Sequence, residues 1–209
     1  MSDSSLVIIS VKPQEMRSVA GTLREDAVLL SIMAGVTITS LKAEFGHDRI
    51  VRAMPNTPAA IGRGITVAVA ARNVSAAQRA TADALLRATG SVEWVDDEGL
   101  MDAVTAVSGS GPAYVFLLAE ELARAGVEAG LPAELATKLA RETVAGSGEL
   151  LHRSDLDSAT LRQNVTSPGG TTAAALEVLM GKDGLQPLMI RAIAAGPSTR
   201  PPTCTELVR

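Results

Sequence analysis

Strongly apolar runs alternate with segments of helical spacing over the first 95 residues, and this alternation constrains the fold more than any other feature of the sequence. The runs S-L-V-I-I-S-V at 5–11 and A-V-L-L-S-I-M at 27–33 are typical of strands buried on both faces of a parallel sheet. The pattern predicts an α/β fold with a parallel-type sheet. Strands are expected at 5–11, 27–33, 49–54, 64–70 and 91–95, with helices at 14–26, 39–45 and 75–89.

From Asp96 onward the pattern indicates helices alone. The helix expected at 113–129 is apolar around much of its surface, which predicts that it is buried. The end of the chain from Gly196 contains three prolines and no apolar period, so an irregular tail is expected. We therefore expect an α/β domain over 1–96, a helical domain over 97–195 and a tail over 196–209. Further helices are expected at 98–107, 132–151 and 156–165, from the turn at 165–170 to Met180, and at 184–195.

Composition excludes several classes of function. The net charge is −4 with no basic block, and aromatic residues make up only 2% of the chain, so nucleic acid is not an expected partner. The single cysteine, Cys204, rules out an internal disulfide, and with only two histidines no metal site is expected. No apolar run is long enough to span a membrane, and the N-terminus lacks a basic segment leading into a signal helix. We expect a cytoplasmic protein with no membrane partner.

The stretch V-T-S-P-G-G-T-T-A-A-A-L-E-V-L-M at 165–180 is typical of a turn that opens a helix. Either Thr171 or Thr172 can cap that helix. Backbone N–H groups at such a helix start favour a carboxylate or phosphate, and the hydroxyls of Ser167 and Thr172 add neutral hydrogen-bonding groups. The alternative is an ordinary loop with a threonine cap. Both interpretations stay open on spacing alone.

Three further segments follow predicted strands, at the carboxyl ends where open α/β sheets bind ligands. Lys12-Pro13 closes the first strand, Met33-Ala34-Gly35 the second, and Pro55-Asn56-Thr57-Pro58 the third. The lysine could meet a cofactor phosphate, the small residues leave room for a flat ligand, and Asn56 is a polar group at the same crevice. The alternatives are a solvated lysine, a plain tight turn and a rigid proline turn. No G-x-G-x-x-G precedes the first strand.

Several motifs taken together resemble the pyrroline-5-carboxylate reductase family, and the resemblance runs from about residue 5 to residue 195. The last two motifs, in the correct order, make the resemblance specific. The motifs are S-V-K-P-Q at 10–14, A-G-V-T-I at 34–38, R-A-M-P-N-T-P at 52–58, D-A-V-T-A-V-S-G-S-G-P-A-Y at 102–114 and T-S-P-G-G-T-T at 166–172.

The resemblance implies a partial Rossmann-type parallel sheet followed by an all-helical dimerisation domain. It implies an oxidoreductase of proline biosynthesis that reduces 1-pyrroline-5-carboxylate to L-proline with NADPH or NADH. It also implies a homodimer, or a higher homo-oligomer, formed through the helical domain. A protonated imine is already electrophilic, so positioning carries most of the catalysis and no strong acid is required.

Site residues follow from the motifs of the family. Thr172 would be the catalytic hydroxyl, orienting the ring nitrogen of the substrate. The substrate would be held by Ser167, Gly170, Thr171 and Thr172, and the cofactor by Ser10, Val11, Lys12, Pro13, Ile32, Met33, Ala34 and, more weakly, Asn56.

The chain is expected to start after the family's glycine fingerprint and second βα unit, roughly 50–60 residues at about 30 residues per unit. That absence predicts weak or absent NAD(P)H binding and an unpaired side on the first strand. The alternative function is a non-catalytic dimerising remnant of the enzyme. The sequence does not distinguish NADPH from NADH.

Overall fold

The computed structural model describes residues 5–19 and 23–198. The chain forms two compact units. One contains the residues up to Pro112 together with those from Ile193 onward, and the other is Ala113–Ala192. The sheet lies in the first unit, and the second is entirely helical.

The sheet contains the five predicted strands in sequence order: β1 (Leu6–Ile9), β2 (Val28–Ser31), β3 (Ile50–Met54), β4 (Gly64–Ala70) and β5 (Gly90–Trp94). The β1–β2, β2–β3 and β4–β5 pairs are parallel, as expected, but β4 runs antiparallel to β3. The physical reason is the short connection through η2 (Thr57–Ile61), because a parallel crossover needs a dozen or more residues. In the described part of the chain, β1 is the edge strand next to β2, so its other side has no strand partner.

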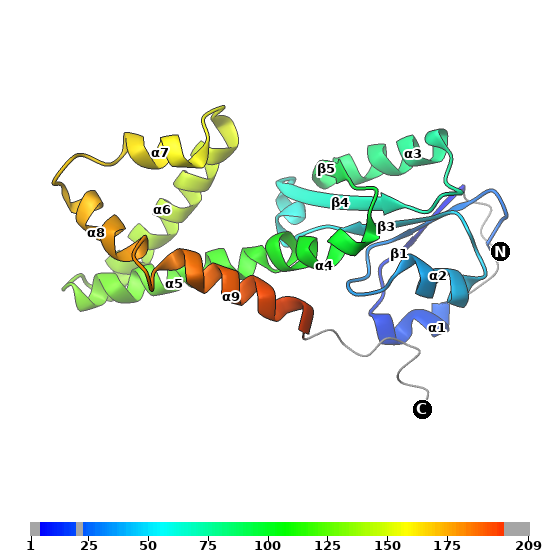
Figure 1. Ribbon diagram of the computed structural model, residues 1–209, viewed down its shortest axis with the longest axis horizontal. Coiled ribbons are helices and arrows are strands. Elements are labelled where there is room, and N and C mark those ends of the chain that lie inside the picture. Colours follow the sequence, from blue (N-terminus) through cyan, green and yellow to red (C-terminus); the bar gives the residue numbers. More distant parts are fainter. Residues whose placement is uncertain (1–4, 20–22, 199–209) are drawn as a thin grey trace. The chain divides into compact units, whose positions relative to one another are not determined.

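Helices cover both faces of the sheet (Figure 1). The helix α3 (Ala76–Leu86) packs Ala82 and Leu86 on one face, against Val28, Leu30 and Val51. On the other face lie α1 (Met16–Val19) and α2 (Ile38–Phe45) over a second apolar cluster. Burial on both faces explains why β2 and β3 are apolar at all but one position each, Ser31 in β2 and Arg52 in β3.

Local signals determine most helix starts in this unit. Thr37 caps α2 by accepting a hydrogen bond from the backbone N–H of Ser40 at 3.1 Å, and Ser75 forms a capping box with Gln78 at the start of α3. The helix predicted over 14–26 is wrong in its length. After the short η1 (Pro13–Glu15) and α1, residues 23–27 form a turn in which Ala27 N–H donates to the Arg24 carbonyl.

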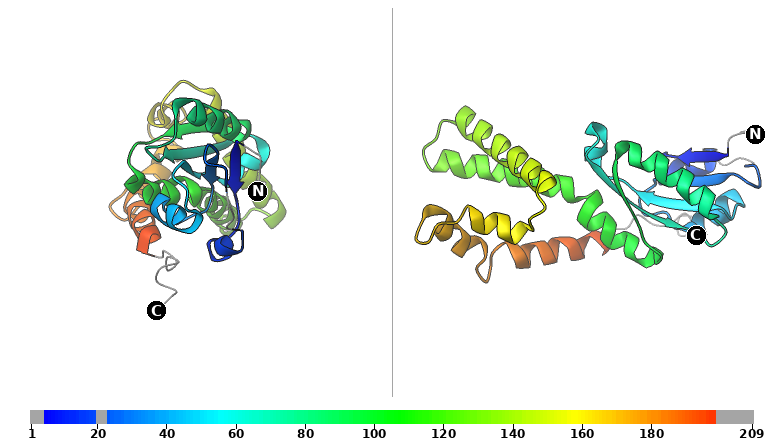
Figure 2. Two further views of the ribbon diagram at one scale, coloured as in Figure 1. Left: turned by 90° about the vertical axis from the view of Figure 1, so that its right-hand side faces the viewer. Right: turned by 90° about the horizontal axis from the view of Figure 1, so that it is seen from above.

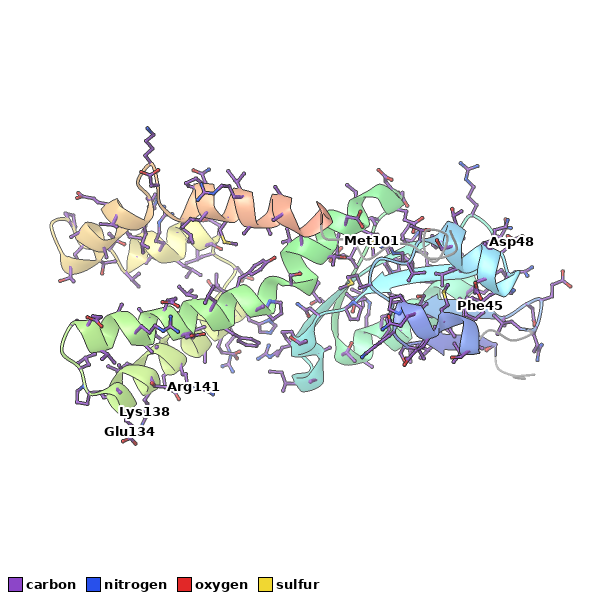
Figure 3. The ribbon with its side chains drawn as sticks, turned by 90° about the horizontal axis from the view of Figure 1, so that it is seen from below. Phe45, Asp48, Met101, Glu134, Lys138 and Arg141 are labelled. Carbon is purple, nitrogen blue, oxygen red and sulfur yellow. The ribbon has the colours of Figure 1, made fainter. Side chains whose placement is uncertain are left out.

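The residues that follow β5 pack on the sheet. They form η4 (Glu98–Leu100), α4 (Met101–Val104) and the π turn η5 (Thr105–Gly109). Met101 is fully buried against Val67 and Val69 (Figure 3), and a Cβ on Gly109 would lie 2.4 Å from the Met54 Cε. The compact units therefore divide at Pro112, sixteen residues later than the expected boundary at residue 96.

The second unit is a set of helices. Its long helices α5 (Gly111–Glu128) and α6 (Ala133–Arg153) are joined by a tight turn (Figure 2) at Gly130, whose φ is +97°. The shorter helices are α7 (Ser158–Asn164) and α8 (Thr171–Leu179), followed by α9 (Leu185–Ser198). Because α9 continues to Ser198, the irregular tail predicted from residue 196 is wrong for residues 196–198, and residues 199–209 lie outside the described residues.

The expected burial of α5 is also wrong. The side chains of Phe116, Leu117 and Leu118 are 67%, 54% and 55% exposed in the single chain. An apolar helix surface that one chain leaves uncovered needs another surface to cover it. Among the described helices, none combines the length and the apolar character needed to cross a lipid bilayer.

Core packing gives a first prediction. Replacing the fully buried Leu41 of α2 with alanine is expected to lower the free energy of unfolding by about 2–5 kcal/mol, because it leaves a cavity under the helix. The same change at Leu85 of α3, which is 41% exposed, is expected to cost less than about 1 kcal/mol. Urea unfolding of both variants measures the difference, and equal losses would contradict this account of the core.

Candidate active site

The loops after β1, β2 and β3 lie at the edge of the sheet formed by the carboxyl ends of these strands, because the three strands are parallel. The residues predicted to line the cofactor are all on these loops. The structure therefore brings Ser10–Pro13, Ile32–Ala34 and Asn56 to the same edge within one compact unit.

The first two loops differ in what they expose. Ser10 and Lys12 are exposed, and Pro13 is the first residue of η1. In the second loop Ala34 is exposed, whereas Met33 is only 3% exposed and packs in the core beneath. The side chain of Met33 therefore supports the edge from below, and its backbone is what the edge presents.

Asn56 has a structural contact. Its side-chain oxygen accepts a hydrogen bond from the backbone N–H of Ile65 at 3.0 Å, which fixes the turn between β3 and β4. Because the side-chain oxygen Oδ1 already makes this hydrogen bond, the side-chain nitrogen of Asn56 is the group left to contact a ligand at this edge.

The predicted substrate loop lies in the helical unit, between α7 and α8 (Figure 1). Thr166 ends α7 by donating from its hydroxyl to the Arg162 carbonyl at 2.7 Å. A turn follows, in which Gly169 has a φ of +69° and the Gly170 N–H donates to the Ser167 carbonyl at 3.1 Å. A positive φ explains why the sequence needs glycine at position 169.

The predicted threonine cap on α8 is wrong, because Gly170 occupies the N-cap position and no side chain caps the helix. The first hydrogen bond of the helix runs from the Ala174 N–H to the Gly170 carbonyl at 3.2 Å. The N–H groups of Thr171, Thr172 and Ala173 are therefore left without partners inside the helix. With no cap to make, the exposed hydroxyls of Thr171 and Thr172 are available to a ligand.

The helix before this loop is fixed by an acidic cap. The carboxylate of Asp157 accepts hydrogen bonds from the backbone N–H of Thr160 at 2.9 Å and from its hydroxyl at 3.0 Å. These bonds hold the pKa of Asp157 below its usual value. Because the pKa is lowered on folding, this stabilisation is present at neutral pH and is lost as the pH falls through the folded pKa.

Comparisons with known proteins identify the family. The sequence model described as pyrroline-5-carboxylate reductase dimerisation matches residues 98–199. The pyrroline-5-carboxylate reductase of Pseudomonas aeruginosa is 43% identical over 200 residues, which cover 93% of this chain and 73% of the relative. That of Synechocystis is 45% identical over 195 residues, covering 92% and 72%. The chain belongs to the pyrroline-5-carboxylate reductase family.

Solved structures agree with this assignment. A pyrroline-5-carboxylate reductase from Coxiella burnetii superposes with a TM-score of 0.85 at 36% identity, covering 94% of this chain and 74% of that one. A Plasmodium falciparum pyrroline carboxylate reductase with NADP bound gives a TM-score of 0.78 at 31% identity, covering 94% and 76%. The partial Rossmann-type sheet and the helical domain predicted from the sequence are therefore confirmed as the fold of this family.

The residues at the sheet edge combine apolar side chains with small residues. Val11 and Ile32 are partly buried and pack against the core clusters on opposite faces of the sheet, whereas Ala34 and Gly35 carry little or no side chain. Apolar groups with nearby backbone polar groups are the usual lining of a small-molecule site. The exposed Lys12 adds a positive charge at the same edge.

Sequence reasoning missed two residues that support a loop at this edge, Arg52 and Glu98. Arg52 lies in the middle of β3 with its side chain only 3% exposed, and it donates to the Glu98 carboxylate at 2.8 Å. Glu98 is separated from it by 46 positions in the sequence. The available signal was an arginine inside a strand that is otherwise apolar, because a buried cation needs a partner.

The turn before α8 gives the second prediction. Gly169→Ala is expected to lower the free energy of unfolding by about 1 kcal/mol or more, since alanine is strained at a φ of +69°. Ser167→Ala, two residues earlier, is the control and is expected to change it by less than about 0.5 kcal/mol. Thermal unfolding of the two variants measures the difference. A gain in stability for Gly169→Ala would show that the turn has another conformation.

Proposed function

We propose that this chain reduces 1-pyrroline-5-carboxylate to L-proline, with NADPH or NADH as the hydride donor. The family assignment supports this function, as do the two groups of residues described above. When bound at the sheet edge, the nicotinamide supplies a hydride to the imine carbon of the substrate, and the ring nitrogen gains a proton.

The observation that carries the proposal is the state of the α8 N-terminus. Three backbone N–H groups lack helical partners there, and the neighbouring hydroxyls of Ser167, Thr171 and Thr172 make no hydrogen bond among the described contacts. Such N–H groups favour a carboxylate, as the substrate carries. The hydroxyl of Thr172 then orients the ring nitrogen, and the Ser167 hydroxyl adds a further contact.

We further propose that the protein acts as a homodimer or a higher homo-oligomer through its helical unit. The matching family model is named for dimerisation and begins at residue 98. The exposed apolar side chains of α5 include Phe116, Leu117 and Leu118. Together with α6, this helix lines an apolar hollow of about 470 Å³, to which Phe116 and Val127 contribute. The hollow gives an apolar side chain of a second copy a place to pack.

Charged side chains lie on α6 beside this hollow. Glu134, Lys138 and Arg141 follow one another along the helix (Figure 3), and Arg141 lines the hollow itself. On α5, Arg124 is held by Glu120 and Glu121 at 2.7 and 2.8 Å. A polar border around an apolar centre is the usual composition of a protein interface.

The cytoplasmic compartment also stays a prediction, and a single cysteine is consistent with the reducing cytoplasm.

The third prediction tests the catalytic hydroxyl. Thr172→Val is expected to lower kcat/KM for 1-pyrroline-5-carboxylate about a hundredfold, the usual cost of one lost hydrogen-bonding group in an active site. Thr172→Ser keeps the hydroxyl and is expected to retain most of the activity. The matched control is Thr81→Val on α3, which is remote from both groups of residues in sequence and makes only a backbone contact.

Initial rates with NADPH and with NADH measure this effect and the cofactor preference together. Equal loss in the Val and Ser variants would show that the hydroxyl is not the active group. A parent chain that dimerises but neither binds NADPH nor turns over substrate would instead be the non-catalytic dimerising protein.

The fourth prediction tests the interface. Phe116→Glu is expected to lower the mass measured by light scattering, to one half where the parent is a dimer, because it would bury a charge in an apolar interface. Leu85→Glu on α3 introduces the same charge at another exposed apolar position and is expected to leave the mass unchanged. A dimer that survives Phe116→Glu would place the interface elsewhere.

A further inference from the structure

The loop that follows β2 is held at both of its ends. At its start, the buried Ser31 accepts a hydrogen bond at its hydroxyl oxygen from the backbone N–H of Met33 at 3.3 Å. At its end, the backbone N–H of Ile38 donates to the Glu98 carboxylate at 2.8 Å. Between these two points lie the exposed Ala34 and the partly buried Gly35.

Glu98 acts at the first turn of α2. Ile38 is the first residue of that helix, so its N–H has no partner within the helix and would otherwise be left unpaired in a partly buried position. The Thr37 side chain satisfies a different N–H, that of Ser40. A carboxylate at a helix N-terminus is also stabilised by the helix dipole. Glu98 is therefore a second cap, supplied from 60 residues further along the chain.

Arg52 fixes Glu98 in this position. Its guanidinium donates to the same carboxylate oxygen, Oε1, that accepts from Ile38. Arg52 pairs with Ser31 across β3 and β2, so the residue that anchors the start of the loop is the sheet neighbour of the arginine that holds Glu98 at its end. The buried Arg52 thereby links the two anchors of the loop.

We propose that Glu98, held by Arg52, is a positioning residue that fixes the loop of residues 32–37 for the nicotinamide cofactor. The cofactor part rests on the proposed function, because the loop lines the edge where the nicotinamide half would bind. Glu98 acts through Ile38 and the loop backbone and does not touch the reacting atoms. A misplacement of about 1 Å caused by a change far from the reacting atoms can lower a reaction rate about a hundredfold, so the position of this loop matters for the cofactor it would hold.

The experiment compares Glu98→Ala and Glu98→Gln with Asp83→Ala in the full chain. Asp83 is a matched control, because its carboxylate also accepts from one arginine, Arg87 at 2.6 Å, and from one other N–H, that of Trp94 at 2.9 Å. It lies on α3, away from the loop in the sequence. Fluorescence titration gives the Kd for NADPH, steady-state rates give KM for each substrate, and hydrogen exchange reports on residues 33–38.

Glu98→Ala is expected to raise the Kd and KM for NADPH about tenfold, with less than about a threefold change in KM for 1-pyrroline-5-carboxylate. Backbone amides of residues 33–38 should exchange faster. Glu98→Gln keeps an acceptor for Ile38 and should lie closer to the parent chain in both readouts. Asp83→Ala is expected to lower the free energy of unfolding without changing the Kd for NADPH or the exchange of residues 33–38.

Exchange of residues 33–38 that is unchanged in Glu98→Ala would overturn the positioning role. Faster exchange with an unchanged Kd for NADPH would overturn the cofactor role alone. A parent chain that fails to bind NADPH would overturn the proposed function and the cofactor role together, and the exchange measurement would still decide whether Glu98 holds the loop.

Discussion

The parallel pairing of β1 with β2 and of β2 with β3 brings three loops to one edge of the sheet. Each loop leaves a strand whose residues are paired in fixed register, so its first residue has little freedom. The reversal at β4 preserves this arrangement, because a short connection returns the chain from the same edge and ties Asn56 to Ile65. The shared position of the residues predicted to line the cofactor is therefore a consequence of strand direction.

A buried arginine makes the sheet depend on residues beyond it. Arg52 is taken out of water in the centre of β3, and an unpaired buried cation would destabilise the fold strongly. Its partner comes from Glu98, after the last strand, so the chain must return across the sheet before it enters the long helices. Glu98 is also the first residue matched by the dimerisation model of the family. The sequence-defined domain therefore starts inside the sheet unit, and the compact units divide later, at Pro112.

Local patterns predicted what is local in this protein. The apolar runs located all five strands, and Ser75 located the start of α3, because both signals act over a few residues. The pairing of Arg52 with Glu98 depends on residues 46 positions apart, which no periodicity reveals. The exposed face of α5 was predicted to be buried because an apolar surface has the same pattern whether its own chain or a second copy covers it. The motifs predicted a substrate loop before α8, and its role stays a prediction, but they did not reveal that Gly170, rather than a threonine, occupies the cap.

This last difference bears on the chemistry of the loop. A threonine that caps its own helix has already used its hydroxyl, whereas Gly170 at the cap leaves both Thr171 and Thr172 free for a ligand. The backbone N–H groups beside them already have fixed directions. Binding a carboxylate therefore costs them no side-chain entropy, whereas a lysine side chain would lose rotamer freedom on binding. This arrangement requires glycine in the turn, because Gly169 has a left-handed φ that other residues avoid. Under the proposed function, such neutral groups on a preorganised backbone would orient an imine, which needs orientation more than it needs a strong acid.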